Sequence, residues 1–195
     1  MLLTIILLVL IGGLSAILGS IVGIGGGIII VPTLVYLGVN HHILHGITPQ
    51  IAIGTSSVIL IVTGLSSSLG YLKTKQVDIK NGSIFLFGLL PGSLIGSFLS
   101  QFLTLDSFNL YFGIFMICVA ILLMVRHKIK PFKIFDKPQY ERTYVDAEGK
   151  TYHYSVPPFF AFVATLFIGI LTGLFGIGGG ALMTPLMLIV FRFPP

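Results

Sequence analysis

Charged residues are scarce in this sequence. Only 9% of its 195 residues are Asp, Glu, Lys or Arg, whereas a soluble domain has roughly 25%. Hydrophobic residues make up 55%, and the mean hydropathy is +1.05. Because a soluble fold could not cover its surface with this composition, soluble enzymes and nucleic-acid-binding proteins are excluded. The composition predicts a protein whose main partner is the lipid bilayer.

Reactive side chains are also few. Cys118 is the only cysteine, which excludes an intrachain disulfide and a thiolate metal site. The apolar runs hold no nucleophile–base pair and no carboxylate, so they predict neither an intramembrane enzyme nor a proton relay. We expect no enzymatic activity and no cofactor, and we assign no metal site. His41, His42 and His45 form a cluster that is more often solvated, with metal binding, pH sensing and anion attraction as alternatives.

Long apolar runs dominate the chain instead. A membrane helix needs about 20 mostly apolar residues, and five runs qualify: residues 2–22, 51–72, 82–103, 108–125 and 159–175. Two shorter runs, 28–37 and 181–191, directly follow glycine clusters and predict half-helices or re-entrant segments. The expected fold class is all-α, a polytopic membrane helical bundle.

The basic residues predict the orientation of this bundle. Ten of the 11 Lys and Arg residues lie in two loops, three between the second and third runs and seven between the fourth and fifth. Cytoplasmic loops carry an excess of Lys and Arg, so both loops are expected on the cytoplasmic side of the membrane. The N-terminus is then cytoplasmic if the first run crosses once, and the loop 38–48 lies outside.

The segment 126–157 is the one sizeable aqueous part of the chain. Two stretches of alternating residues flank the turn-forming sequence 146–149, which predicts a small β-hairpin. A cytoplasmic connector without a partner is the simpler interpretation, and contact with anionic lipid is the alternative. The expected organisation is a first repeat at 1–125, this loop at 126–157, and the start of a second repeat at 158–195.

An internal repeat is the most informative pattern. The sequence GIGGGIIIVP at 23–32 recurs as GIGGGALMTP at 176–185, an offset of 153 residues, and each copy follows an apolar run. Four crossings between the copies predict parallel repeats, related by an axis along the membrane normal. The second repeat is expected to be incomplete, which makes a fragment or a homodimer possible interpretations.

The glycines predict a break in each helix. A glycine in a helix interior costs about 1 kcal/mol relative to Ala, and freed backbone groups at membrane depth need a protein or cavity partner. We expect breaks at about 23–31 and 176–184, with Pro32 and Pro185 in the first turn of the helix that resumes. Exposed N–H groups at these helix ends would form an anion site without a charged side chain. Close packing of G-x-x-x-G pairs is the alternative.

Hydroxyl residues in the second run complete the candidate site. Thr55 and Ser56 stand near its outer end, close to the expected break, and other hydroxyls there are better explained as contacts between helices. The third run carries Gly88, Gly92 and Gly96 in steps of four, which predicts a packing ridge with no chemistry. The candidate substrate-binding residues are Gly23, Gly25, Gly26, Gly27, Pro32, Thr55, Ser56, Gly176, Gly178, Gly179, Gly180 and Pro185.

These motifs resemble one known family. The sequence GIGGGIIIVP, the pentapeptide AIGTS at 52–56, and the second GIGGG followed by Pro185 are similar to the sulfite exporter TauE/SafE family, also called the toluene-sulfonate uptake permease family. The resemblance covers nearly the whole chain apart from 126–157. It implies an inner-membrane protein of two similar halves that moves sulfite, sulfonates or sulfoacetate. One departure is that no second Ala-x-Gly-Thr-Ser follows Pro185.

The sequence therefore predicts a permease or exporter for small anions that contain sulfur. The alternative is a membrane interaction protein without transport activity, or a non-functional truncated copy.

Overall fold

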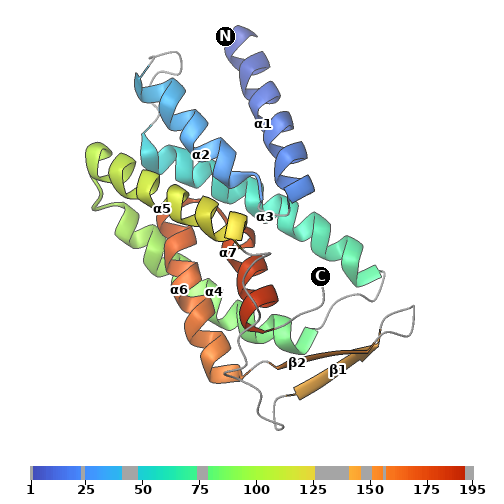
Figure 1. Cartoon of the computed structure of the whole chain (residues 1–195). Helices are drawn as coiled ribbons and strands as arrows, with labels where there is room; N and C mark the ends of the chain where they lie inside the picture. The colour runs from blue at the N-terminus through green and yellow to red at the C-terminus, as the bar shows by residue number, and fades with distance from the viewer. Residues whose placement is uncertain are drawn as a thin grey trace.

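The structure is a computed structural model that describes residues 2–22, 25–40, 48–73, 79–125, 141–145, 151–155 and 157–191. These residues form a bundle of helices beside a two-stranded hairpin (Figure 1). The helices are α1 Leu2–Val22, α2 Gly27–Val35, α3 Pro49–Lys73, α4 Ile79–Ser100, α5 Leu105–Val125, α6 Pro158–Phe175 and α7 Gly180–Pro185. Two π-helical segments continue α2 and α7, namely η1 Tyr36–Asn40 and η4 Leu186–Val190.

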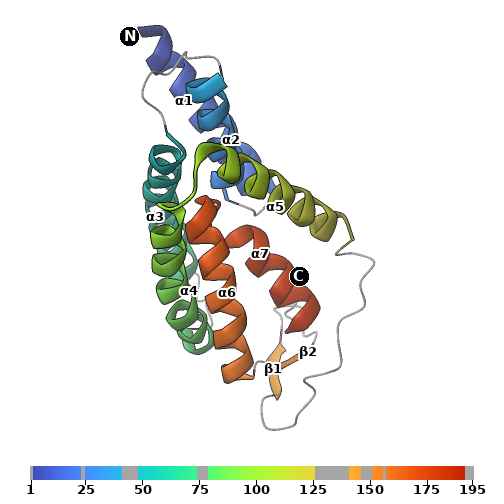
Figure 2. The ribbon, with the colours of Figure 1, turned by 90° about the vertical axis from the view of Figure 1, so that its left-hand side faces the viewer.

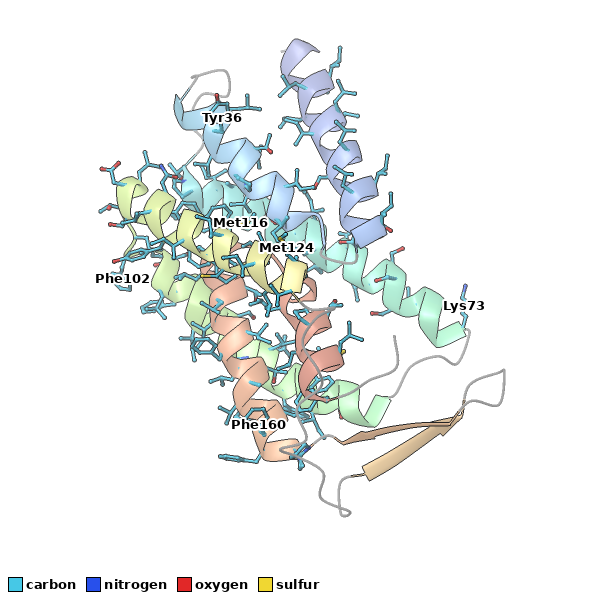
Figure 3. The ribbon with its side chains drawn as sticks, viewed as in Figure 1. Tyr36, Lys73, Phe102, Met116, Met124 and Phe160 are labelled. Atoms are coloured by element: carbon cyan, nitrogen blue, oxygen red, sulfur yellow. The ribbon has the colours of Figure 1, made fainter. Side chains whose placement is uncertain are left out.

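The five predicted spans correspond to α1, α3, α4, α5 and α6, with ends shifted by a few residues. Among the described residues, four of these helices are long and apolar enough to cross a membrane: α3, α4, α5 and α6. Helix α1 is apolar over the shorter stretch Ile5–Ile21. Large apolar side chains point away from the bundle, as Phe102 does in Figure 3. The fold is that of a multi-spanning helical membrane bundle.

The aqueous segment holds two strands, β1 Glu141–Val145 and β2 Thr151–Ser155. They pair antiparallel, with Glu141 opposite Ser155 and Val145 opposite Thr151. These are the two alternating stretches for which the sequence predicted a hairpin. The hairpin modifies the all-α expectation locally and leaves the helical bundle unchanged.

Two helical hairpins face each other in the bundle. Helix α1 runs from the N-terminus toward the middle of the molecule and α2 runs back, whereas α6 rises from the opposite end and α7 descends again (Figures 1 and 2). The two copies of the glycine motif therefore meet from opposite directions. The chain turns back after each glycine segment in this arrangement, and the membrane topology of the two copies stays a prediction.

Helices α4 and α6 form the most extensive contact of the bundle, and they run in the same direction. Gly88 lies against Thr165, Gly92 lies against Gly169, and Gly96 lies against Leu174, so the residue numbers rise together. A Cβ atom on any of these three α4 glycines would overlap the backbone or a side chain of α6. The glycine ridge predicted for packing is confirmed, since small residues allow the two backbones to approach closely.

Aromatic side chains hold α5 against the upper end of α6. Phe175, the last residue of α6, has ring centroids 6.0 Å from Phe108, 5.7 Å from Phe112 and 4.9 Å from Phe115. Phe108, Phe112 and Phe175 are buried. Because Phe175 directly precedes Gly176, this cluster fixes the point at which the second glycine segment begins.

The ends of the elements lie on two sides of the molecule. Lys73, at the end of α3, and Phe160, at the start of α6, lie toward the end that carries the hairpin, and Tyr36 lies toward the opposite end (Figure 3). The start of α1 is also at that opposite end (Figure 1). The start of α1 and the end of α3 at Lys73 therefore lie toward opposite ends of the molecule.

Candidate functional site

The first glycine segment, residues 23–26, separates α1 from α2, and the structure describes Gly25 and Gly26 of it. Gly25 has φ +83°, a conformation that side chains rarely adopt, and its N–H donates to the carbonyl oxygen of Gly19 at 3.3 Å. The buried hydroxyl of Ser15 donates to the carbonyl oxygen of Gly26 at 2.6 Å. Gly23 lies outside the described residues. Helix α1 thus holds the turn by two hydrogen bonds.

The second glycine segment, residues 176–179, separates α6 from α7. Gly176 ends α6 with φ +67°, and its N–H donates to the carbonyl oxygen of Thr172 at 2.8 Å. Gly178 has φ +84°, and Gly179 is in the right-handed region with φ −65° and ψ −24°. Glycine is the residue type that adopts these positive φ values at little cost.

Positions related by the 153-residue offset share one backbone conformation. Gly25 and Gly178 differ by one degree in φ, at 83° and 84°. Gly26 has φ −69° and ψ −20°, close to the values of Gly179. The helices that follow begin at Gly27 and Gly180, which the same offset relates. The sequence repeat thus reproduces one local turn twice.

Both breaks are shorter than predicted. The helices resume at Gly27 and Gly180, so Pro32 and Pro185 lie inside helical segments, each five residues after the start. A proline there removes the N–H that would pair with the carbonyl four residues earlier. Each of these helices continues into a π-helical segment a few residues on, η1 and η4. The prolines therefore mark a change in helix geometry and do not start the first turn.

One face of α3 contacts both glycine segments. The Ser56 hydroxyl is fully buried and donates to the carbonyl oxygen of Gly176 at 2.6 Å. A Cβ on Gly176 would come within 2.9 Å of the Cα of Ile53. One turn beyond Ser56, the side chain of Leu60 lies 3.4 Å from the Cβ position of Gly25 and 2.9 Å from that of Gly178. Ile53, Ser56 and Leu60 share one helical face.

The two segments also contact each other directly. A Cβ on Gly27 would lie 2.6 Å from the carbonyl oxygen of Gly176, 2.7 Å from that of Ile177 and 2.7 Å from the Ser56 hydroxyl. Gly27 is buried, and so are Gly176 and Ile177. These distances are shorter than real Cβ contacts, so the absence of a side chain at Gly27 allows its backbone to pack closely against Gly176 and Ile177. The packing interpretation applies to Gly27 and Gly176, and positive φ angles require glycine at Gly25, Gly176 and Gly178.

We call the place where the two glycine segments meet the Ile53, Ser56 and Leu60 face of α3 the junction. Not every predicted residue contacts it. Thr55 is exposed and donates to the carbonyl oxygen of Ile51 in its own helix at 2.8 Å. Farther along α3, Thr63 and Ser67 are exposed and likewise bond within their helix. Ser56 is the one hydroxyl of the AIGTS pentapeptide that touches a glycine segment. The histidine cluster at 41–45 lies outside the described residues, and no metal-binding group occurs among the residues that the structure describes.

Backbone donors remain available at the start of α7. The first bonds of that helix are made by Leu182 and Met183, whose N–H groups donate to the carbonyl oxygen of Gly179 at 3.2 and 2.8 Å. Within the described part of the chain, the N–H groups of Gly180 and Ala181 have no acceptor. Ala181 is fully buried. A buried N–H without a partner is rare in proteins and favours a ligand or a water molecule at that point.

Comparison with known proteins places this arrangement in a family. The family model described as sulfite exporter TauE/SafE matches residues 8–195. The chain belongs to the sulfite exporter TauE/SafE family. It is thus a multi-pass membrane protein. No solved structure matches it.

Curated relatives have transporter names. The chain is 44% identical over 190 residues to the probable membrane transporter protein YunE of Bacillus subtilis, covering 97% of this chain and 69% of that protein. It is 33% identical to the probable membrane transporter protein MJ0441 of Methanocaldococcus jannaschii, covering 93% and 60%, and 28% identical to one from Xylella fastidiosa, covering 94% and 62%. The chain thus spans about two thirds of the length of these TauE/SafE relatives.

Two residues of the junction were missed by sequence reasoning. Ser15 and Leu60 were not singled out from the other residues of their apolar runs. The position of Leu60, four residues after Ser56 and hence on the same helix face, was the available signal. For Ser15 the signal was its place one turn before Gly19, on the side that faces the returning helix.

Proposed function

We propose that the chain forms part of a membrane transporter for small anions, of the sulfur-containing class that includes sulfite, sulfonates and sulfoacetate. The observation that carries this proposal is the meeting of two glycine segments on the Ile53, Ser56 and Leu60 face of α3. The name of the family supports the substrate class, and the names of the relatives support transport.

The proposal includes a topology. We take each hairpin to be re-entrant, so that α1–α2 enters from one side of the membrane and α6–α7 from the other. Helices α3, α4 and α5 then provide three crossings between the copies, and an odd number of crossings makes the repeats inverted. Inverted repeats with broken helices at the midplane are one architecture of secondary transporters. The basic loops are cytoplasmic, so the N-terminus lies outside.

The anion is recognised by backbone groups in this proposal. The N–H groups of Gly180 and Ala181 supply donors, and the positive end of the helical run that begins with α7 adds attraction. Ser56 acts as a positioning residue, because its single hydroxyl proton is already donated to Gly176. Leu60 separates Gly25 from Gly178 and thereby limits the size of what passes between them. A site without Lys or Arg also allows the anion to leave.

The test is uptake of radiolabelled sulfite into membrane vesicles from cells that express the chain. Gly179→Leu is the informative variant, because a Cβ there makes only ordinary contacts, 3.6 Å to Leu89 and 3.7 Å to Met183. Gly113→Leu on α5 is the matched control, since a Cβ there has nothing within 4 Å. We expect the first variant to abolish uptake and the second to retain it. Vesicles that hold the intact protein and show no uptake above empty-vector vesicles overturn the proposal.

A further inference from the structure

Helix α1 carries a stripe of small residues on a face that no described element covers. Gly12, Ala16 and Ser20 follow at intervals of four, so they share one helical face. A Cβ on Gly12 would have nothing within 4 Å, and Ala16 and Ser20 are exposed. The neighbouring face of the same helix is used differently, because Ser15 and Gly19 are buried against the first glycine segment.

The repeat shows what such a face does elsewhere in the molecule. The 153-residue offset relates Gly12 to Thr165, Ala16 to Gly169 and Ser20 to Gly173. On α6 these positions form the groove into which α4 packs, where the Cβ position of Gly169 lies 3.0 Å from the Cα of Gly92 and that of Gly173 lies 2.8 Å from the Cα of Ser93.

The larger residues beside the stripe also differ in exposure between α1 and the equivalent positions of α6. Ile17 and Ile21 of α1 are 59% and 77% exposed. Their equivalents on α6, Ile170 and Leu174, are half-buried because Gly96 of α4 lies against them. The groove of α6 is thus filled, whereas the equivalent groove of α1 is covered by none of the described helices.

We infer that the Gly12, Ala16 and Ser20 face of α1 is the docking site of an apolar helix with small residues at every fourth position, which runs parallel to α1 in the register that α4 adopts on α6. The occupant is not α4 of a second copy, because the glycine ridge of α4 is already buried against α6. Its source is the additional length of the family's proteins, since the relatives extend beyond the part that this chain matches. Close approach of backbones stabilises such a pair in lipid.

The test is disulfide cross-linking in phosphatidylcholine–phosphatidylglycerol vesicles. The probe is a membrane-inserted peptide with the sequence of residues 79–100 and a cysteine in place of its glycine at 92. The chain carries Cys118→Ser and a single new cysteine, either Ala16→Cys or Leu14→Cys, the latter on the opposite face of α1. Copper phenanthroline oxidises neighbouring thiols to a disulfide, which requires Cα atoms within about 7 Å.

The expected result is at least about fivefold more cross-linking at position 16 than at position 14, because only that face places the Cα atoms close enough. The register supplies an independent check. Gly12→Cys is expected to cross-link with a peptide cysteine at 88 and not with one at 96, in the relation that Gly88 has to Thr165. Equal yields at positions 16 and 14, or a reversed register, overturn the inference.

Two further controls separate the alternatives. Adding Ala16→Leu to the Gly12→Cys chain fills the groove and is expected to remove the cross-link, while thermal melting by circular dichroism verifies that the bundle remains folded. If Ala16→Cys chains join to one another without peptide as efficiently as they join to it, the face is a contact between copies of this chain and the inference is wrong.

Discussion

The hydroxyl of Ser56 donates a 2.6 Å hydrogen bond to the carbonyl oxygen of Gly176, which lies 120 residues later in the chain. The bond joins the AIGTS pentapeptide of α3 to the second glycine segment, and the Ser56 side chain is fully buried. The Cβ position of Gly27 lies 2.7 Å from the same hydroxyl. Three motifs that are separate in sequence thus meet around one oxygen atom, and this contact makes Ser56 the most informative position for mutation.

Replacing Ser56 by Ala should destabilise the bundle, because a buried carbonyl loses its donor. The expected decrease in the free energy of unfolding is about 1–3 kcal/mol. Ser57→Ala is the matched control, since the Ser57 hydroxyl donates to Ile53 within its own helix. Thermal melting of the purified protein in detergent, followed by circular dichroism, measures both. Equal melting temperatures for the two variants would contradict the role assigned to Ser56.

Gly178 and Gly179 should respond differently to Ala. Gly178 has φ +84°, and its Cβ position lies 2.9 Å from Leu60, whereas Gly179 is right-handed and a Cβ there makes only ordinary contacts. A left-handed conformation costs a side chain roughly 1–2 kcal/mol. Gly178→Ala is expected to lower the melting temperature and Gly179→Ala to leave it nearly unchanged. The prediction fails if Gly179→Ala is the more damaging of the two.

The contact between α4 and α6 should depend on the absence of side chains. Gly92→Ala places a methyl group against the carbonyl oxygen of Leu166 and forces the helices apart. Overpacking of this kind costs typically about 1–3 kcal/mol. Gly113→Ala on α5 adds the same methyl group in open space and is expected to be neutral or stabilising. A melting temperature of Gly92→Ala at or above that of Gly113→Ala would contradict the close contact.

Opposite placement of the two ends can be tested by labelling. In a Cys118→Ser background, Leu2→Cys and Lys73→Cys provide single thiols at the start of α1 and the end of α3. We expect a membrane-impermeant maleimide added to intact cells to label position 2 and not position 73. Reaction at both positions should follow when the cells are opened. Labelling of both positions from the same side would contradict this expectation and would support the predicted parallel repeats.

Leu60 should control the size of the transported anion if the proposed function is right. Its side chain lies between Gly25 and Gly178, so Leu60→Ala widens the space between the two turns. We expect this variant to raise uptake of a bulky sulfonate relative to sulfite, because sulfite needs less room. Val58→Ala, at a 63% exposed position of the same helix, is the control and should leave the ratio unchanged. An equal change of the uptake ratio in both variants would contradict a role for Leu60 in the pathway.

Much of the bundle was predictable because the relevant information is local. Hydropathy over about 20 residues identifies a helix that suits lipid, and the predicted runs agree with the helices to within a few residues. The glycine ridge of α4 was predictable as a packing surface for the same reason. Its partner was not, because nothing in the sequence relates Gly92 to Gly169 before the chain folds.

The candidate site was predictable only in part. The doubled motif identified the positions of both breaks, but the same residue type performs two tasks there. Gly25 and Gly178 are needed for their positive φ, whereas Gly27 is needed because Gly176 and Ile177 approach it. Thr55 and Ser56 are adjacent in sequence, yet they point to different surroundings because neighbouring residues on a helix are about 100° apart.

The sequence by itself determined a helical membrane protein with two copies of one glycine turn, because apolar length and glycine conformation act over short stretches of chain. The tertiary structure alone decided that the two turns meet from opposite directions against Ser56 and Leu60. It also decided that α4 fills the groove of α6, whereas no element that the structure describes covers the equivalent groove of α1. The physical reason is that a glycine turn either continues a helix across the membrane or reverses it. That choice depends on contacts with α3 and α5 that lie far away in the sequence.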